Sequence, residues 1–238
     1  MRRGLYVLVI GMIFMPTWVN GQTVGTKAGP IQYPESLAPW NFKAAIEMAF
    51  IKMPEAVVEE ADTYRWPSWD VDVFMGLPAN FVANGKVTTQ FINWHFQIGG
   101  KWQWAPTERL HTYLGVDWAY FMGGVGAGGF DNSNRSSFLY PNLSVGYDFG
   151  PLTLTVKGEL NYLLSKQDRA GEITVSDSKN IFNGFSTALY LEQPFWGETE
   201  FIIAFRANYL KFIYQNWLLF PTTDTSYFVP EFILGVRL

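Results

Sequence analysis

The feature that most constrains this chain is a two-residue alternation of apolar and polar side chains, which recurs from Asp62 onward. Between Leu110 and Tyr120, for example, large apolar residues alternate with small, polar or charged ones. A period of two is typical of β-strands, because successive side chains point to opposite faces of a sheet. The same alternation recurs in segments that begin at Trp69, Leu143, Leu152, Thr187, Phe201 and Phe228. The pattern predicts an all-β chain.

The composition of the two strand faces indicates a membrane barrel. A soluble sandwich also alternates, but its solvent-facing side is rich in Lys, Glu and Thr. Here the polar face is poor in Lys and rich in Gly, Ala, Ser and Asn, which suits a crowded lumen. Segments of about ten residues or more also match a tilted crossing of a bilayer. We therefore expect a transmembrane antiparallel up-and-down β-barrel with an outward apolar face.

Aromatic residues support the same class. The chain contains 10 Trp, 12 Tyr and 20 Phe, more rings than a soluble core of this size would bury. At a membrane–water boundary such rings are stable, with their apolar bodies in lipid and their polar tips in water. The expected interfacial girdles include Trp69, Trp102, Trp104, Trp118, Tyr162 and Tyr209.

The first hundred residues allow two strand counts. In the favoured one, residues 41–53 form a strand and residues 81–104 split into two strands, which gives ten in all. In the alternative, residues 42–57 carry the apolar stripe of an amphipathic helix. Asn84-Gly85 then forms a hairpin turn, and eight strands remain. Ten is favoured because 24 residues is long for one crossing.

The connections are expected to alternate in length along the rest of the chain. Short turns are predicted at residues 105–108, 149–152 and 194–197. Longer polar loops are predicted at residues 122–135, 166–179 and 215–226. Short periplasmic turns and longer external loops are typical of outer-membrane barrels.

The N-terminus predicts export. Arg2 and Arg3 precede an apolar run that is too short for a comfortable spanning helix, and Val19-Asn20-Gly21 offers a cleavage site. We expect a signal peptide at residues 1–21, a periplasmic segment at 22–40 and a barrel at 41–238. An uncleaved N-terminal anchor is the alternative.

The last dozen residues carry a resemblance. Residues 227–238 read YFVPEFILGVRL and resemble the terminal strand of bacterial outer-membrane proteins. That pattern usually closes with an aromatic residue, whereas this chain closes with Leu238. The resemblance implies a Gram-negative outer membrane, with the barrel assembly machinery as a partner during insertion and outer-membrane lipids as a partner afterwards.

Several kinds of chemistry are disfavoured. The chain has no cysteine, which excludes disulfides, thiolate metal sites and a lipid-modified N-terminal cysteine. A formal charge of −4 without a basic stripe argues against nucleic-acid binding. The G-x-G-x-x-G match at residues 124–129 lacks the following helix of a dinucleotide site, so we read it as an external loop. The two histidines, His95 and His111, lack the spacing of a zinc site. No cofactor and no metal are expected.

An enzymatic function is the alternative to a non-enzymatic barrel. Asp70 and Asp72 share one strand face, as paired aspartates do in the omptin surface proteases, which are ten-stranded barrels. Those enzymes also need a His two residues from another Asp, and neither histidine here has one. A barrel hydrolase acting on lipid or peptide could use His111 as general base, with the Asp117 carboxylate orienting the imidazole, although the two lie six residues apart.

The charged side chains predicted to face the lumen decide the expected function. If paired, they form a salt-bridged plug; if free, they form a constriction that selects small solutes. Side chains just fill the interior of an eight-stranded barrel, and a ten-stranded barrel is close to that size, which argues against a wide porin. We expect a narrow solute channel or a structural or surface-interaction protein; a soluble periplasmic β-protein is a weaker alternative. The lumen candidates are Lys43, Glu47, Asp70, Asp72, His111, Lys157, Glu159, Arg206, Glu231 and Arg237.

Overall fold

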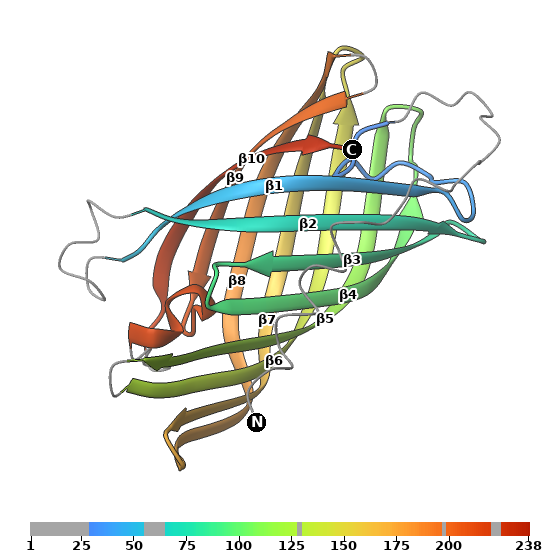
Figure 1. Cartoon of the computed structure of the whole chain (residues 1–238). Helices are drawn as coiled ribbons and strands as arrows, with labels where there is room; N and C mark the ends of the chain where they lie inside the picture. The colour runs from blue at the N-terminus through green and yellow to red at the C-terminus, as the bar shows by residue number, and fades with distance from the viewer. Residues whose placement is uncertain (1–28, 55–64, 128–129, 197–198, 220–224) are drawn as a thin grey trace.

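The chain folds, in a computed structural model, into a closed barrel of ten antiparallel β-strands (Figure 1). The structure describes residues 29–54, 65–127, 130–196, 199–219 and 225–238. The strands are β1 (Phe42–Lys52), β2 (Arg65–Leu77), β3 (Phe81–Thr89), β4 (Asn93–Trp104), β5 (Leu110–Ala127), β6 (Phe130–Asp148), β7 (Thr153–Ala170), β8 (Ile173–Trp196), β9 (Thr199–Leu210) and β10 (Tyr227–Arg237). The 3-10 helix η1 (Tyr214–Leu219) lies between β9 and β10.

Strand pairing follows the order of the sequence. Each strand pairs with the next, and β1 pairs with β10 to close the barrel. In this closing seam Glu47 lies opposite Gly235 and Phe50 lies opposite Phe232. The topology is therefore up-and-down, which confirms the predicted fold class and the favoured count of ten strands.

The eight-stranded alternative is wrong at two places. The segment that could have been an amphipathic helix is strand β1, because its inward side chains, such as Ala45 and Ala49, alternate with outward ones. Asn84 and Gly85 lie in the middle of β3, opposite Gly99 and Ile98, rather than in a turn. Pairing with strands on both sides overrides the local turn preference. The chain instead reverses at residues 90–92, where Phe91 has a φ of 68°.

Strands β5–β8 are longer than a membrane crossing requires. They contain 18, 19, 18 and 24 residues, whereas the other six contain 9 to 13. A tilted crossing takes about 9–11 residues. Figure 1 shows β5–β8 reaching past the ends of the other strands at one end of the barrel.

The predicted loops at residues 122–135 and 166–179 are therefore largely wrong. Gly123 pairs with Asn134 between β5 and β6, and Lys166 pairs with Ser178 between β7 and β8. Residues 122–135 are rich in Gly and Asn, and residues 166–179 are rich in charged side chains, so neither segment carries the apolar alternation of a strand. Ladder hydrogen bonds with a neighbouring strand do not require that face.

The wall has an apolar outer surface and a mostly polar inner one. Outward side chains are neighbours across consecutive strand pairs and form an apolar belt around the barrel. One row of this belt runs through Val145, Val156, Leu189, Phe205, Phe232 and Phe50. Inward positions hold most of the buried polar residues, such as Asp70, Gln97 and Asn142.

The two ends of the barrel are named by their chain connections. At the near mouth β1 begins, β10 ends, and short connections join β2 to β3, β4 to β5 and β6 to β7. The far mouth lies at the opposite end and carries the extensions of β5–β8 and helix η1 (Figure 1). Among the described residues no helix is long and apolar enough to cross a membrane.

Candidate functional site

The barrel interior is closed by three layers of residues. Residues 29–41, which we call the N-terminal plug, fold back into the near mouth. A charged layer of side chains from the strands occupies the middle. Residues 211–219, which we call the lid, fold into the far mouth between β9 and β10.

Lys86 on β3 is the centre of the charged layer. Its Nζ lies 2.7 Å from Asp70 Oδ2, 3.3 Å from Asp72 Oδ2 and 3.7 Å from Glu47 Oε2. Glu47 is fully buried, and Asp70 and Asp72 are nearly so. Charges in a low-dielectric interior are costly unless paired, and here three carboxylates share one ammonium group. Loss of Lys86 would leave all three without their cation.

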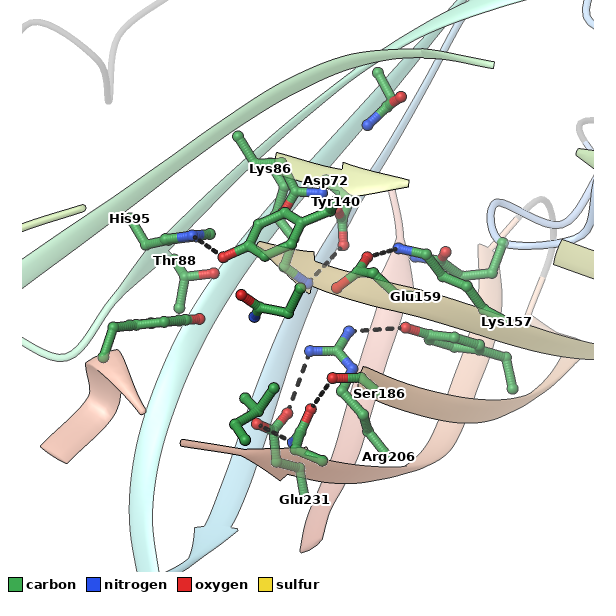
Figure 2. A pocket seen from close by; sticks show the side chains of 18 of the residues that line it. Asp72, Lys86, Thr88, His95, Tyr140, Lys157, Glu159, Ser186, Arg206 and Glu231 are labelled. Carbon is green, nitrogen blue, oxygen red and sulfur yellow. Dashed lines mark hydrogen bonds and ion pairs between the residues drawn. The ribbon is translucent and has the colours of Figure 1, made fainter. Parts of the chain in front are cut away.

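Arg206 on β9 organises the opposite wall of the lumen (Figure 2). Its Nη1 donates to Glu231 Oε2 at 3.2 Å and its Nη2 donates to the Tyr190 hydroxyl at 3.0 Å. Glu231 also accepts a hydrogen bond from Asn208 at 2.9 Å. Opposite charges on neighbouring strands are therefore fixed in defined partnerships.

A small cavity remains between these groups. Its volume is about 50 Å³, and its lining includes Glu159 and Arg206 from the strands. Gln32 from the plug and Tyr214 from the lid also line it, so both ends contribute to its closure. One water needs roughly 10–15 Å³ of such space. The cavity therefore holds a few waters and is too small for a solute such as a sugar.

Lys101 on β4 differs from the other lumen cations. It is buried, and its Nζ lies 4.7 Å from the ring centre of Phe74 and 5.8 Å from that of Tyr113. Within the part of the chain that the structure describes, no carboxylate forms an ion pair with it. Cation–π contacts with the two rings stabilise its charge instead.

Glu192 on β8 holds the N-terminal plug. Its Oε1 accepts the backbone N–H of Ile31 at 2.7 Å and that of Gln32 at 3.0 Å. Its Oε2 accepts the backbone N–H of Tyr33 at 2.9 Å. Three successive backbone amides thus surround one buried carboxylate, an arrangement known from anion-binding nests.

Two cations bind the backbone carbonyls of the plug. Arg237 Nη1 donates to Gly29 O at 2.8 Å, and Lys43 Nζ donates to Pro30 O at 2.9 Å. Lys43 also forms an ion pair with Glu35 of the plug, and Arg237 lies 3.6 Å from Glu200. The near mouth therefore contacts the plug with both positively and negatively charged side chains.

Glycines in the wall make room for the plug. A Cβ at Gly146 would lie 2.5 Å from the Tyr33 ring, and one at Gly76 would lie 2.7 Å from Leu37 O. Tyr33 stacks on His111 with ring centres 5.1 Å apart, and its hydroxyl donates to Arg109 O at 3.0 Å. Burial, together with the charge of Asp148, raises the pKa of Tyr33 to about 12, so this donor stays protonated.

The lid closes the far mouth with aromatic rings. Tyr214 stacks on His95 with centroids 4.4 Å apart and planes 2° apart. Trp217 packs where Gly123 has no side chain; a Cβ there would lie 2.5 Å from its indole. Phe212 stacks on Phe138 at 6.1 Å, and its backbone N–H donates to Asn183 Oδ1 at 2.7 Å. Burial raises the pKa of the Tyr214 phenol, which keeps this side chain uncharged.

All ten lumen candidates from the sequence point into the barrel. Three of them, Lys43, His111 and Arg237, lie at the level of the plug. The other seven lie in the charged layer: Glu47, Asp70, Asp72, Lys157, Glu159, Arg206 and Glu231. In this layer Lys157 pairs with Glu159 at 2.9 Å.

The geometry around His111 does not assemble a hydrolase site. His111 contacts Tyr33 of the plug, and in the described residues its ring nitrogens have no serine or carboxylate partner. Asp117 instead accepts hydrogen bonds from Gln97 at 2.7 Å and Asn142 at 3.1 Å. The other histidine, His95, contacts Tyr140 OH at 3.2 Å through Nε2. Across the described ranges no group of three or more His, Asp or Glu side chains is placed to hold a metal ion.

Sequence reasoning missed four residues that organise the lumen: Lys86, Lys101, Glu192 and His95. The sequence signal for Lys86 is its place in an inward-facing series on β3, which alternates with outward residues and also contains Val82, Asn84 and Thr88. The possible hairpin turn at Asn84-Gly85 obscured this signal, because a turn there would interrupt the strand. The alternation from Thr187 to Leu191 places Glu192 on the inward face, but no local signal predicts its partners, which lie about 160 residues earlier in the chain.

No protein-family model matches the sequence, and no curated protein is similar to it. Solved structures that resemble the fold include Neisserial surface protein A, at 14% identity and a TM-score of 0.38, with 83% of this chain and 96% of that one covered. The translocator domain of the autotransporter NalP from Neisseria meningitidis is 8% identical, with a TM-score of 0.43 and coverages of 86% and 90%. The KdgM porin is 8% identical, with a TM-score of 0.36 and coverages of 81% and 97%.

Proposed function

We propose that this chain is a small outer-membrane β-barrel that is closed in its resting state and serves a structural or surface-interaction role. The observation that carries this proposal is the central cavity of about 50 Å³, enclosed by paired charges, the N-terminal plug and the lid. An open diffusion pore needs a continuous water-filled lumen, and this one is filled with side chains.

The outer surface supports residence in a membrane. Large apolar side chains such as Leu114, Ile98 and Phe205 are exposed to about half of their surface. Soluble monomers rarely expose contiguous apolar patches larger than a few hundred Å². Because the belt runs across neighbouring strands, lipid is the environment that would cover it. The predicted signal peptide and the terminal strand support the outer membrane as that environment, and residues 1–28 lie outside the described residues.

The extended strands support a surface role. Beyond the length of a crossing, β5–β8 carry polar residues such as Asn132, Ser133 and Arg135. A sheet of this composition is stable in water, because its polar side chains stay hydrated and its backbone groups pair within the ladder. In an outer membrane it would project from the cell on the side opposite the near mouth.

Two assays test the proposal. The mature chain is refolded into phospholipid vesicles, which are then extracted with alkaline carbonate and, separately, tested for swelling in isotonic sugar solutions. Retention in the vesicles without swelling is expected. Release by carbonate would contradict membrane insertion, whereas retention with swelling would contradict the closed state.

A narrow gated solute pathway is the second candidate, because polar residues line the lumen from Gln32 in the plug to Gln215 in the lid. A barrel with a purely structural role could instead have an interior filled with apolar side chains. The two candidates differ in whether displacing the lid produces conductance.

A further inference from the structure

The contacts that hold the plug are mostly directed at its backbone. Glu192 accepts three backbone N–H groups, and Arg237 and Lys43 donate to two backbone carbonyls. Tyr113 of β5 donates from its hydroxyl to a third carbonyl, that of Glu35, at 2.7 Å. All of these receptor groups belong to the barrel wall. Another peptide that adopts the same backbone conformation offers the same amides and carbonyls.

Specificity comes from two side chains of the plug. Ile31 is 2% exposed and packs in a cluster with Phe74, Tyr113 and Tyr190 of the wall. Tyr33 is 4% exposed and occupies the space above Gly146, against His111. Both residues belong to the bend at residues 31–33, whose three backbone amides converge on Glu192.

The plug supplies the hydrogen bonds that the buried Glu192 carboxylate needs. Glu192 is buried, and within the described part of the chain its hydrogen-bond donors are the three plug amides. A buried carboxylate without donors or a cation is strongly disfavoured. The mouth is therefore built to hold a peptide, rather than being incidentally covered by one.

We infer that the near mouth is a binding site for a peptide that adopts this bend, with an apolar residue two positions before an aromatic one, and that the chain's own N-terminal plug occupies it here. A segment of another polypeptide with this pattern would take the site when the plug is displaced. The tether gives the plug an effective concentration in the millimolar range, so a free peptide competes only when the plug is weakened.

The test uses the full mature chain with the plug weakened and the wall unchanged. Ile31→Asp together with Tyr33→Asp places charges in both apolar contacts. A fluorescent peptide with the sequence of residues 29–41 is then titrated against the refolded barrel, and binding is measured by anisotropy. We expect saturable binding to this double variant, at least about tenfold tighter than to the wild type, whose site is occupied.

Matched controls define the result. A peptide carrying the same two aspartates should not bind. Glu192→Ala in the double variant should abolish binding, and so should Gly146→Val, which fills the Tyr33 position without removing a polar group. Each variant is first checked for the compact, heat-modifiable barrel on a gel and for carbonate-resistant insertion.

Two outcomes would overturn the inference. One is no saturable binding to an inserted double variant. The other is equal binding to all barrels, including both wall variants, which would mean adsorption to the surface. Neither outcome affects membrane insertion, so this inference and the proposed function fail separately.

Discussion

Tyr214 of the lid lies parallel to His95 of β4, with ring centroids 4.4 Å apart. Tyr214 approaches from the segment between β9 and β10, whereas His95 belongs to the wall. Their stack, with Phe121 at 5.3 Å from the Tyr214 ring, separates the cavity from the far mouth. The contact therefore links closure of the lumen to a loop that lies at the end of the barrel.

Removal of the Tyr214 ring should loosen the lid. Aromatic pairs contribute about 0.5–1.5 kcal/mol beyond burial, so Tyr214→Ala should increase lid opening, whereas the plug and the charged layer should still block ions. Tyr214→Phe is the matched control, because in the described structure the hydroxyl forms no hydrogen bond. Protease cleavage in residues 211–219 measures lid opening, and ion flux through vesicles should stay at the wild-type level. Identical behaviour of the two variants would contradict the role of the ring.

Replacement of Lys86 should destabilise the barrel. Lys86→Ala leaves three buried carboxylates without their shared cation, for which we expect a loss of about 3–5 kcal/mol in unfolding free energy. Arg135→Ala, at an exposed site on β6, should stay within about 0.5 kcal/mol of the wild type. Denaturant unfolding in lipid vesicles measures both. A loss at Lys86 no larger than at Arg135 would mean that the charged layer is hydrated and screened.

Adjacent glycines on β4 should respond differently to the same change. A Cβ at Gly99 would overlap the Asp117 carboxylate and lie 2.7 Å from Val116 O, whereas one at Gly100 meets nothing within 4 Å. Gly99→Ala should therefore cost about 1–3 kcal/mol, and Gly100→Ala should be close to neutral. The unfolding midpoints of the two variants provide the comparison, and equal midpoints would show that Gly99 is not packed against the lumen.

The strand segments with an apolar outer face were predictable from sequence, because the apolar belt requires a strict period of two. Leu114, Val116 and Trp118 show this on β5. Beyond Met122 β5 contains three Gly residues, Val125 and Ala127, and the period disappears although the strand continues. The sequence pattern therefore predicts loops where the structure has strand extensions.

The lumen residues were predictable one by one, but their partners were not. The alternation places Glu47 and Arg206 inside, yet which charges meet depends on register across several strands. The plug had no signal at all. Residues 29–41 lack alternation, and their main contact, Glu192, lies far along the chain.

A charge on the apolar belt should be costly only where lipid surrounds it. Leu189 lies midway along the paired length of β8 and β9, and Leu189→Arg should lose about 2–4 kcal/mol in vesicles. Ile173 is 72% exposed near the tip of the β7–β8 extension, so Ile173→Arg should be nearly neutral. If both variants were neutral, the belt would not lie in the hydrocarbon layer.

The most direct test of the closed barrel is planar-bilayer recording of the refolded mature chain. We expect the inserted wild type to stay electrically silent, because in the described part of the chain the paired charges, plug and lid enclose a cavity of about 50 Å³. Discrete, reproducible single-channel openings of the wild type would contradict it and would make the chain an open channel.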